Sequence, residues 1–309
     1  MTSLGPTSTI PNDARGAAIA LGNFDGVHLG HQAVIASAAD AAEELGVALG
    51  VAVFEPHPRR YFKPDTPPFR LQSTRQRARA LSELGVEEVF EIGFDAALAG
   101  SSDREFAERV LRDLLGIAHV SVGADFEFGK GRCGNAASLA RLGDVLGFGV
   151  AAVEPIGGDA KVSSTSIREA IARGDMTAAS EMLTRPWAIE GEVLKGFQRG
   201  RTLGFPTANV ALGDYVRPRL GVYAVRVDLG DGVLLPGVAS VGVNPTVGAL
   251  PEPLLEAHLF DFSGDLYGKT TEVELVAFLR DEARFDSLGE LKRQMTQDVI
   301  DARRALVGA

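Results

Sequence analysis

The sequence contains a single cysteine among its 309 residues, and this scarcity limits its chemistry. With Cys133 alone, an intramolecular disulfide and a cysteine-based metal cluster are excluded, as is typical of proteins from a reducing compartment. Cys133 lies in the polar stretch GKGRCGN, with no histidine or obvious activating base beside it. We therefore expect an ordinary loop thiol rather than a nucleophile.

Long hydrophobic runs are also missing from the sequence. No apolar stretch approaches the ~20 residues that are needed to cross a bilayer. The opening stretch, MTSLGPTSTIPNDARG, lacks the basic region and apolar core of a secretory signal, so we expect a frayed N-terminus. These features predict a cytoplasmic protein without a membrane partner.

The sequence has fewer basic than acidic residues. The chain has 31 lysines and arginines against 41 aspartates and glutamates, which gives a formal net charge of −10. Such a chain does not hold nucleic acid over a broad surface, so we expect no nucleic-acid partner, although local basic loops are compatible with binding a small anion. The sequence leaves the oligomeric state open, and a weak or transient homo-oligomer is compatible with it.

The chain is long enough for two domains, and its first part alternates strand-like runs with helical patterns. This alternation predicts a Rossmann-like α/β domain, in which helices cover both faces of a parallel sheet. Ser102 and Glu105 have the spacing of a helix capping box. The predicted strands lie within residues 17–24, 47–56, 86–94, 117–126 and 148–156, and the predicted helices within 31–45, 74–84, 103–115 and 138–146.

The pattern changes near Pro186, where short alternating runs separated by glycine turns begin. The stretch GVYAVRVDLGDGVLLPGVASVG predicts a hairpin that turns at residues 230–232, and TTEVELVAFL predicts a further strand. The chain ends in a predicted helix over 288–306, introduced by Ser287 and Glu290 at capping-box spacing. We therefore predict an α/β domain over residues 1–183 and a small antiparallel β-barrel with a terminal helix over 184–309.

The stretch LGNFDGVHLGHQAVI ends a strand, turns at glycines and starts a helix at once. Free N–H groups and the helix dipole favour an anion at such a helix start. Gly22, Gly26 and Gly30 let the backbone approach a ligand closely, while His28 and His31 can both donate to phosphate oxygens. This arrangement suits a triphosphate that is attacked at an internal phosphorus.

A structural role for this turn is about equally well supported by these residues alone. Glycine turns between strand and helix are common in α/β folds, and the histidines are compatible with capping. A zinc site is less favoured, because no third protein ligand has a suitable spacing.

A second turn, KVSSTSIREAIARG, shifts the balance. Ser163, Ser164 and Thr165 lead into a helix, and Arg168 is predicted in its first turn. An arginine there opposes the helix dipole unless an anion compensates for it. Capping by Ser164 or Thr165 explains the hydroxyls but not the arginine. Two such turns after different strands favour nucleotide phosphate chemistry.

Four motifs in this order, GNFDGVHLGH, FEPHP, VGADFEFGKGRCGN and VSSTSIR, resemble the adenylyltransferase half of the bacterial bifunctional riboflavin kinase/FMN adenylyltransferases, or FAD synthetases. In the second half, GRTLGFPTANV, GVYAV, NPTVG, LEAHLFDFSGDLYGK and LRDEARFDS are similar to the riboflavin kinase barrel. The resemblance runs from about Ala17 to Arg303. It implies that riboflavin and ATP give FMN in the barrel, and that FMN and ATP give FAD and pyrophosphate in the N-terminal domain. Magnesium accompanies ATP, and FMN and FAD are substrate or product rather than bound redox cofactors.

Three positions depart from the usual pattern of the family. Ala20 stands where threonine is frequent, Lys195 where histidine is common, and Trp187 where tyrosine is usual. Each keeps a compatible shape or charge, so the departures concern substrate positioning rather than either reaction.

For adenylyl transfer, the resemblance assigns stabilisation of the α-phosphate and the leaving pyrophosphate to four residues. The FMN phosphate is already an anion and needs no general base. His57 follows a strand end and faces the same crevice, Asn23 and Asp125 orient adenosine or flavin groups, and His119 and His258 serve structure. The catalytic residues are His28, His31, Ser164 and Arg168, and the nucleotide-binding residues are Gly22, Asn23, Phe24, Asp25, Gly26, Gly30, Ser163, Ser164 and Thr165, with His57 and Asp125 on the flavin.

For the kinase, riboflavin attacks with a neutral hydroxyl, which needs a base to take its proton. From the sequence alone Glu256 is more simply a solvent-facing strand residue, but the resemblance favours it as the base. Thr207 and Asn209 alternate on an extended segment, so both oxygens can hold magnesium with an ATP phosphate.

Two further groups complete the predicted kinase site. The glycines of GFQRGRTLGFPTAN indicate a flexible loop over phosphate, with positive charge from three side chains. The loop residues are Lys195, Arg199, Arg201 and Gly204, and the residues expected to contact the flavin are Arg280 and Phe285.

Two rival functions remain open. One is a nucleotidyltransferase for another phosphorylated vitamin, with a regulatory second domain. The other is a barrel that stores flavin or binds single-stranded nucleic acid without turnover, although the latter would need exposed aromatic residues interleaved with cations. ATP consumption that depends on riboflavin separates all three.

Overall fold

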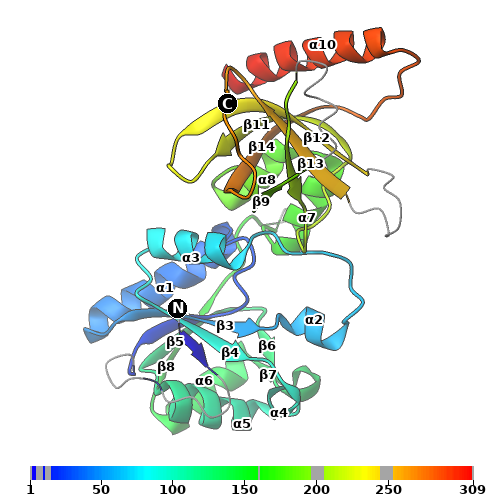
Figure 1. The fold of residues 1–309 in the computed structure, drawn as a ribbon. Coiled ribbons are helices and arrows are strands. Elements are labelled where there is room, and N and C mark those ends of the chain that lie inside the picture. The colour runs from blue at the N-terminus through cyan, green and yellow to red at the C-terminus, as the bar shows by residue number, and fades with distance from the viewer. Residues whose placement is uncertain are drawn as a thin grey trace. The chain divides into compact units, whose positions relative to one another are not determined.

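The computed structural model describes residues 2–4, 10, 15–158, 161–195, 205–243 and 253–307. The chain divides into two compact units (Figure 1). The first comprises Met1–Thr66 and Thr74–Ser163, and the second comprises Pro67–Ser73 and Ser164–Ala309. The boundary between residues 183 and 184 stays a prediction about which parts fold separately.

A six-stranded parallel sheet forms the centre of the first unit, with the strand order β1-β4-β3-β2-β5-β8. Five of these strands lie within the predicted runs and confirm the α/β fold. The sixth, β1, pairs with β4 and forms one edge of the sheet, so the expectation of a frayed N-terminus was wrong at this point. A three-residue strand is too short to show alternation in sequence. The strands are β1 (Thr2–Leu4), β2 (Ala18–Leu21), β3 (Leu49–Glu55), β4 (Glu88–Gly93), β5 (His119–Gly123) and β8 (Gly149–Val153).

Helices pack on both faces of this sheet, as predicted. Alternate residues of β2 belong to different apolar clusters: Ala18 packs with α1 and α3, and Ile19 packs with α5, η2 and α6. Side chains of a strand alternate between faces, so the two clusters are the two sides of one sheet. The helices are α1 (Leu29–Leu45), α3 (Thr74–Glu83), α5 (Asp103–Phe106), η2 (Ala107–Leu115) and α6 (Ala136–Leu146), and shorter elements are α2 (Pro58–Phe62), α4 (Ala96–Ala99), β6 (Glu127–Phe128), η3 (Lys130–Arg132) and β7 (Gly134–Asn135).

The predicted helix over 103–115 begins at the predicted capping box. The Ser102 side chain accepts from the Glu105 N–H, and the Glu105 carboxylate accepts from the Ser102 N–H. After Phe106 the helix widens into the π-helix η2, and the Gly116 N–H bonds to the Leu111 carbonyl five residues earlier.

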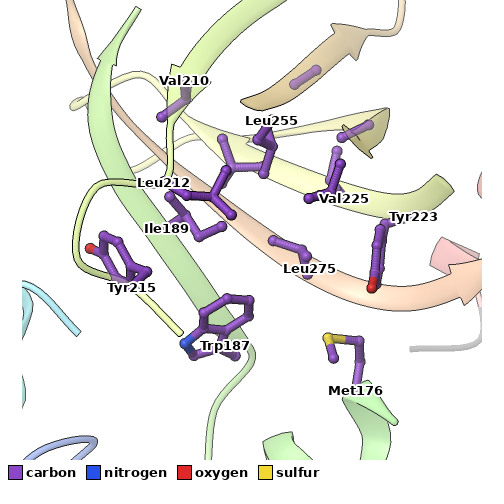
Figure 2. Packing of buried hydrophobic residues seen from close by; sticks show 14 of the residues in the cluster. Met176, Trp187, Ile189, Val210, Leu212, Tyr215, Tyr223, Val225, Leu255 and Leu275 are labelled. Carbon is purple, nitrogen blue, oxygen red and sulfur yellow. The ribbon is translucent and has the colours of Figure 1, made fainter. Parts of the chain in front are cut away.

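The second unit contains a closed antiparallel barrel with the order β10-β13-β12-β11-β14-β9, which confirms the predicted fold. The hairpin turns at residues 229–233, where the Asp228 carboxylate accepts from the N–H groups of Gly230 and Gly232. Figure 2 shows side chains of different strands, among them Ile189, Val210 and Leu275, meeting inside the barrel. The elements are β9 (Trp187–Leu194), β10 (Ala208–Ala211), β11 (Gly221–Asp228), β12 (Leu234–Val243), β13 (Pro253–Leu259), β14 (Thr270–Arg280) and α10 (Leu288–Val307).

Two helices that precede the barrel in sequence share its core. They are α7 (Ser164–Arg173) and α8 (Met176–Leu183). Ile167, Ile171 and Met176 are almost completely buried in the same cluster as Trp187 and Leu275 of the barrel. Figure 2 places Met176 near Trp187 at one end of this core.

Residues 67–73, here called the strap, also belong to the second unit. Arg70 forms a parallel bridge with Tyr215, with the Arg70 N–H donating to Asp214 and the Val216 N–H donating to Arg70. Leu71 is 2% exposed within the barrel cluster, and its carbonyl accepts from the Trp187 indole N–H at 2.8 Å. A segment that is distant in sequence thus becomes part of the barrel unit.

Candidate active sites

The predicted phosphate turn joins β2 to α1 in the first unit. His28 is the N-cap of α1, and its Nδ1 accepts from the His31 N–H at 3.3 Å. The two imidazole rings are stacked with centroids 3.6 Å apart. Because Nδ1 is an acceptor, the proton of a neutral His28 lies on Nε2, which is then a donor. The structure thus brings both histidines together at a helix start.

The backbone of this turn takes uncommon conformations. Phe24 and Val27 have φ angles of 50° and 43°, in a region that residues with a Cβ seldom adopt. A Cβ on Gly30 would lie 3.2 Å from Cε1 of His28, so glycine lets the imidazole lie against the helix start. Strain of this kind in non-glycine residues is frequent at ligand-binding sites.

Polar groups beside the histidines are buried. The Oδ1 atom of Asn23 is buried without a hydrogen-bond partner among the described residues, and the Asp25 side chain is also buried. An unsatisfied buried acceptor is costly unless a ligand or water supplies a donor. The Asn23 amide is therefore suited to accept from an amino or hydroxyl group.

Residues after neighbouring strands lie at the same edge of the sheet, since β3, β2 and β5 are adjacent and parallel. His57 follows β3, and its Nδ1 accepts from the Arg59 N–H at 3.0 Å, which again leaves Nε2 as the donor. Asp125 follows β5, is exposed, and forms an ion pair with Lys161. Sequence reasoning did not single out Lys161, although a cation just before the SSTS turn was the available signal.

The second predicted anion turn, at residues 163–168, is divided between the two units. Ser163 lies in the first unit, whereas Ser164, Thr165 and Arg168 belong to α7 in the second. Because α7 begins at Ser164, Arg168 is its fifth residue, so its predicted place in the first turn was wrong. The Arg168 Nε donates to the Phe69 carbonyl at 2.7 Å, and the guanidinium lies 5.6 Å from the centre of the Phe69 ring. The strap therefore supplies the partner that the sequence left unexplained.

The predicted kinase residues meet on the barrel. Asn209 of β10 lies directly opposite Glu256 of β13. Side chains in such a pair share a face, with Cβ atoms about 5 Å apart. Their neighbours Val210 and Leu255 are in the barrel core, so the pair is on the outer face. Asn209 is 6% exposed, and Glu256 is half-buried.

This pair and Thr207 fit a magnesium ion. Thr207 lies two residues before Asn209, where an extended chain directs both side chains to one side. Hydroxyl, amide and carboxylate oxygens are the donors that Mg²⁺ prefers. The outer face of β10 and β13 therefore has suitable chemistry for the metal.

The remaining predicted kinase residues lie in different parts of the barrel unit or outside the described residues. Lys195 is exposed and follows Leu194, which pairs with Asn209 across β9 and β10. Arg280 makes a two-pronged ion pair with Asp298 of α10, with nitrogen–oxygen distances of 2.7 and 2.6 Å, and lies 6.0 Å from the Phe285 ring. Of the other predicted loop residues, Arg199, Arg201 and Gly204 lie outside the described residues.

Asp298 was missed by sequence reasoning. It is 5% exposed on a helix that otherwise buries only Ala302, and a carboxylate so placed signals an internal partner. The two histidines expected to be structural make protein contacts: His119 bonds to Ser121, and the Nδ1 of His258 lies 2.9 Å from the Pro206 carbonyl.

Burial is the main cause of a shifted pKa at four side chains among the described residues. It raises the pKa of Tyr215 to about 12, raises the pKa of Tyr223 and of Glu274, and lowers the pKa of His119. Each shift disfavours the charged form, as expected when a group loses water.

No helix among the described residues has the length and apolar character of a membrane span. Within the same residues, no group of three histidine, cysteine, aspartate or glutamate side chains is arranged to hold a metal.

Comparison with known proteins gives two family matches in sequence order. Residues 10–166 match the model of FAD synthetase, and residues 183–306 match that of riboflavin kinase. The bifunctional riboflavin kinase/FMN adenylyltransferase of Pseudomonas fluorescens is 46% identical over 290 residues, covering 94% of this chain and 93% of the relative. The proteins of that name from Escherichia coli K12 and Bacillus subtilis are 40% and 36% identical, and cover 93% and 97% of this chain and 92% and 95% of their own lengths.

A solved structure described as a macrolide-efflux protein from Streptococcus pneumoniae is also similar. It is 31% identical, has a TM-score of 0.86, and the match covers 96% of both chains. Its description differs from those of the curated relatives, and the family assignment depends on the two family models and those relatives. Since both halves match in order over nearly the whole length, the chain belongs to the family of bifunctional riboflavin kinase/FMN adenylyltransferases, which convert riboflavin to FMN and FMN to FAD.

Proposed function

We propose that riboflavin is phosphorylated on the outer face of the barrel, with Glu256 as the general base. The observation that carries this proposal is the direct pairing of Asn209 with Glu256. Glu256 takes the proton of the attacking ribityl hydroxyl, whose oxygen then accepts the γ-phosphoryl group of ATP while ADP leaves. The carboxylate acts within reach of the residues that hold the phosphate side of the reaction.

Thr207 and Asn209 are the proposed magnesium ligands. When bound, Mg²⁺ neutralises charge on the transferring phosphate. Lys195, at the end of β9, adds positive charge beside the same strand, and Arg280 and Phe285 are proposed to contact the flavin. Arg201 and Gly204 are proposed to belong to the loop over the phosphates.

We further propose that adenylyl transfer takes place at the edge of the first unit's sheet. The Nε2–H of His28, together with His31, donates to oxygens of the α-phosphate and the leaving pyrophosphate. Gly22, Phe24, Asp25, Gly26 and Gly30 shape the turn, while Asn23, His57 and Asp125 orient the adenosine or flavin groups. Ser163, Ser164, Thr165 and Arg168 are proposed to contribute from the second turn. The FMN phosphate attacks the α-phosphorus and pyrophosphate leaves, so no base is needed.

Paired assays of two variants test both assignments. Glu256→Gln should lower riboflavin kinase turnover by roughly 10²–10⁴, because the base is lost, and should spare conversion of supplied FMN to FAD. His31→Ala should do the reverse and lower FAD formation by about 10²–10³. Each variant is the folded control for the other.

Three results would contradict the proposal. Equal loss of both activities in Glu256→Gln would indicate misfolding or one shared site. Unchanged kinase activity would remove Glu256 from the reaction. Near-normal FAD formation by His31→Ala would reduce the glycine turn to a structural element.

A further inference from the structure

The strand register extends the pair of Asn209 and Glu256 into a row across the barrel. Each residue in the row lies opposite the next on the neighbouring strand, from the proposed magnesium ligand through the proposed base to a proposed flavin contact. The row runs Asn209, Glu256, Ser240, Val222 and Arg280, on β10, β13, β12, β11 and β14. Ser240 is the polar member to which neither the sequence nor the family match assigns a role.

Ser240 lies on the same outer face as Glu256. Its neighbours Ala239 and Val241 belong to the barrel core, while Val238 packs in the small cluster beneath α10. Because side chains alternate along a strand, the Ser240 hydroxyl is directed outward. It is half-buried and directly opposite Glu256, so their Cβ atoms are about 5 Å apart.

The proposed reaction sets the direction of the substrate along this row. The reacting hydroxyl is at the free end of the ribityl chain, and the isoalloxazine ring is at the other end. The phosphate and magnesium side of Glu256 is β10, which carries Asn209. The chain must therefore leave Glu256 on the opposite side, across β12 and Ser240.

The far end of the row limits how the flavin lies. Val222 is only 7% exposed because the outer cluster under α10 covers it. Arg280 is held to α10 by Asp298. The barrel surface that remains for a polyol chain beside Glu256 is thus at Ser240, before α10 begins.

We propose that Ser240 binds a hydroxyl of the ribityl chain and so selects a flavin that carries a polyol. The inference rests on the proposed kinase site at Glu256. A hydrogen bond between uncharged groups is worth about 1–1.4 kcal/mol, which corresponds to a roughly 5–10-fold change in binding. The isoalloxazine ring itself gains nothing from Ser240.

The test compares riboflavin with lumiflavin, which has the same ring but a methyl group in place of the ribityl chain. Both are measured through the kinase reaction of the full chain, riboflavin as substrate and lumiflavin as competitive inhibitor, so the other flavin site does not contribute. In Ser240→Ala, kcat/KM for riboflavin should fall roughly 5–10-fold, while the inhibition constant of lumiflavin stays within about twofold. Thr270→Val, which removes an exposed hydroxyl at the start of β14, is the matched control and should change neither.

The outcomes separate the inference from the proposed function. An unchanged kcat/KM in Ser240→Ala, or an equal loss for riboflavin and lumiflavin, would overturn the role of Ser240 while the kinase assignment stands. If Glu256→Gln keeps full kinase activity, the proposed site is wrong and the inference is overturned with it.

Discussion

Replacing Leu71 by alanine should destabilise the barrel unit, although this residue lies more than a hundred positions before the barrel strands in sequence. Leu71 is 2% exposed within the cluster that contains Trp187 and Ile189. The mutation removes three carbons from this core and leaves the strap backbone intact. The hydrogen bond from the Trp187 indole to the Leu71 carbonyl can therefore persist.

The expected loss of stability follows from the burial of the Leu71 side chain. Leucine-to-alanine substitutions in cores cost about 2–5 kcal/mol, depending on how far the surroundings collapse. For a unit of about 150 residues, a loss of 3 kcal/mol lowers the midpoint of thermal unfolding by roughly 6–12 °C. The kinase turnover measured well below this midpoint should not change. The strap meets the first half of β9, at Trp187 and Glu190, whereas Lys195 follows the other end of the strand, about 13 Å beyond Glu190.

Trp187 supplies the assay, since it is the only tryptophan in the chain. Its fluorescence reports unfolding of the core end shown in Figure 2, where its ring lies near Tyr215 and Met176. The control is Leu45→Ala, at the end of α1 in the first unit, where the side chain is 53% exposed. A surface substitution of this kind should change stability by less than about 0.5 kcal/mol.

The reasoning would be refuted by a Leu71→Ala variant whose Trp187 transition has the same midpoint as the parent chain. That result would mean that the strap only rests on the barrel. A fall in kinase turnover at low temperature would refute the second half of the argument, because it would connect the strap to the reacting end of β9.

Three further predictions concern the same unit. Burial raises the pKa of Tyr215 to about 12, so the folded state keeps the phenol proton to higher pH than the unfolded state does. The contribution of Tyr215 to the free energy of unfolding is therefore complete below pH 10. It is lost as the pH rises towards 12, by up to about 3 kcal/mol. Tyr215→Phe removes the hydroxyl that accepts from the Glu190 N–H, so the variant should be less stable than the parent chain. In urea unfolding, the difference in free energy between variant and parent should become smaller above pH 10. A difference that stays constant with pH would contradict this. Burial also raises the pKa of Glu274, so the charge of this carboxylate opposes folding at pH 7. Glu274→Gln should therefore unfold at a higher temperature than the parent chain at pH 7, and at the same temperature below pH 4. A lower unfolding temperature at pH 7 would reject the argument. Finally, a fragment that starts at residue 164 should be more stable than one that starts at 184, because only the longer one contains α7 and α8; both should phosphorylate riboflavin, and a folded but inactive fragment would show that the site needs the other unit.

Elements that depend on local pattern could be predicted from the sequence. The alternation of apolar runs and the capping box at Ser102 located five strands of the sheet and the helices between them, because strand and helix periods and caps involve residues close in sequence. The glycines and histidines around His28 likewise indicated a helix start suited to an anion. The motifs of both halves were sufficient to indicate the family.

Only the tertiary structure decided which distant residues meet. Glu256 lies opposite Asn209 and Ser240 because the antiparallel register of the closed barrel aligns them, and a shift by one residue would send each side chain to the other face. Arg168 turns to Phe69 because the strap packs against α7, so its partner comes from about a hundred residues earlier in the chain. Such pairings depend on burial of whole surfaces and on strand register, which local sequence does not encode, whereas strands, helices and caps are set by neighbours a few residues away.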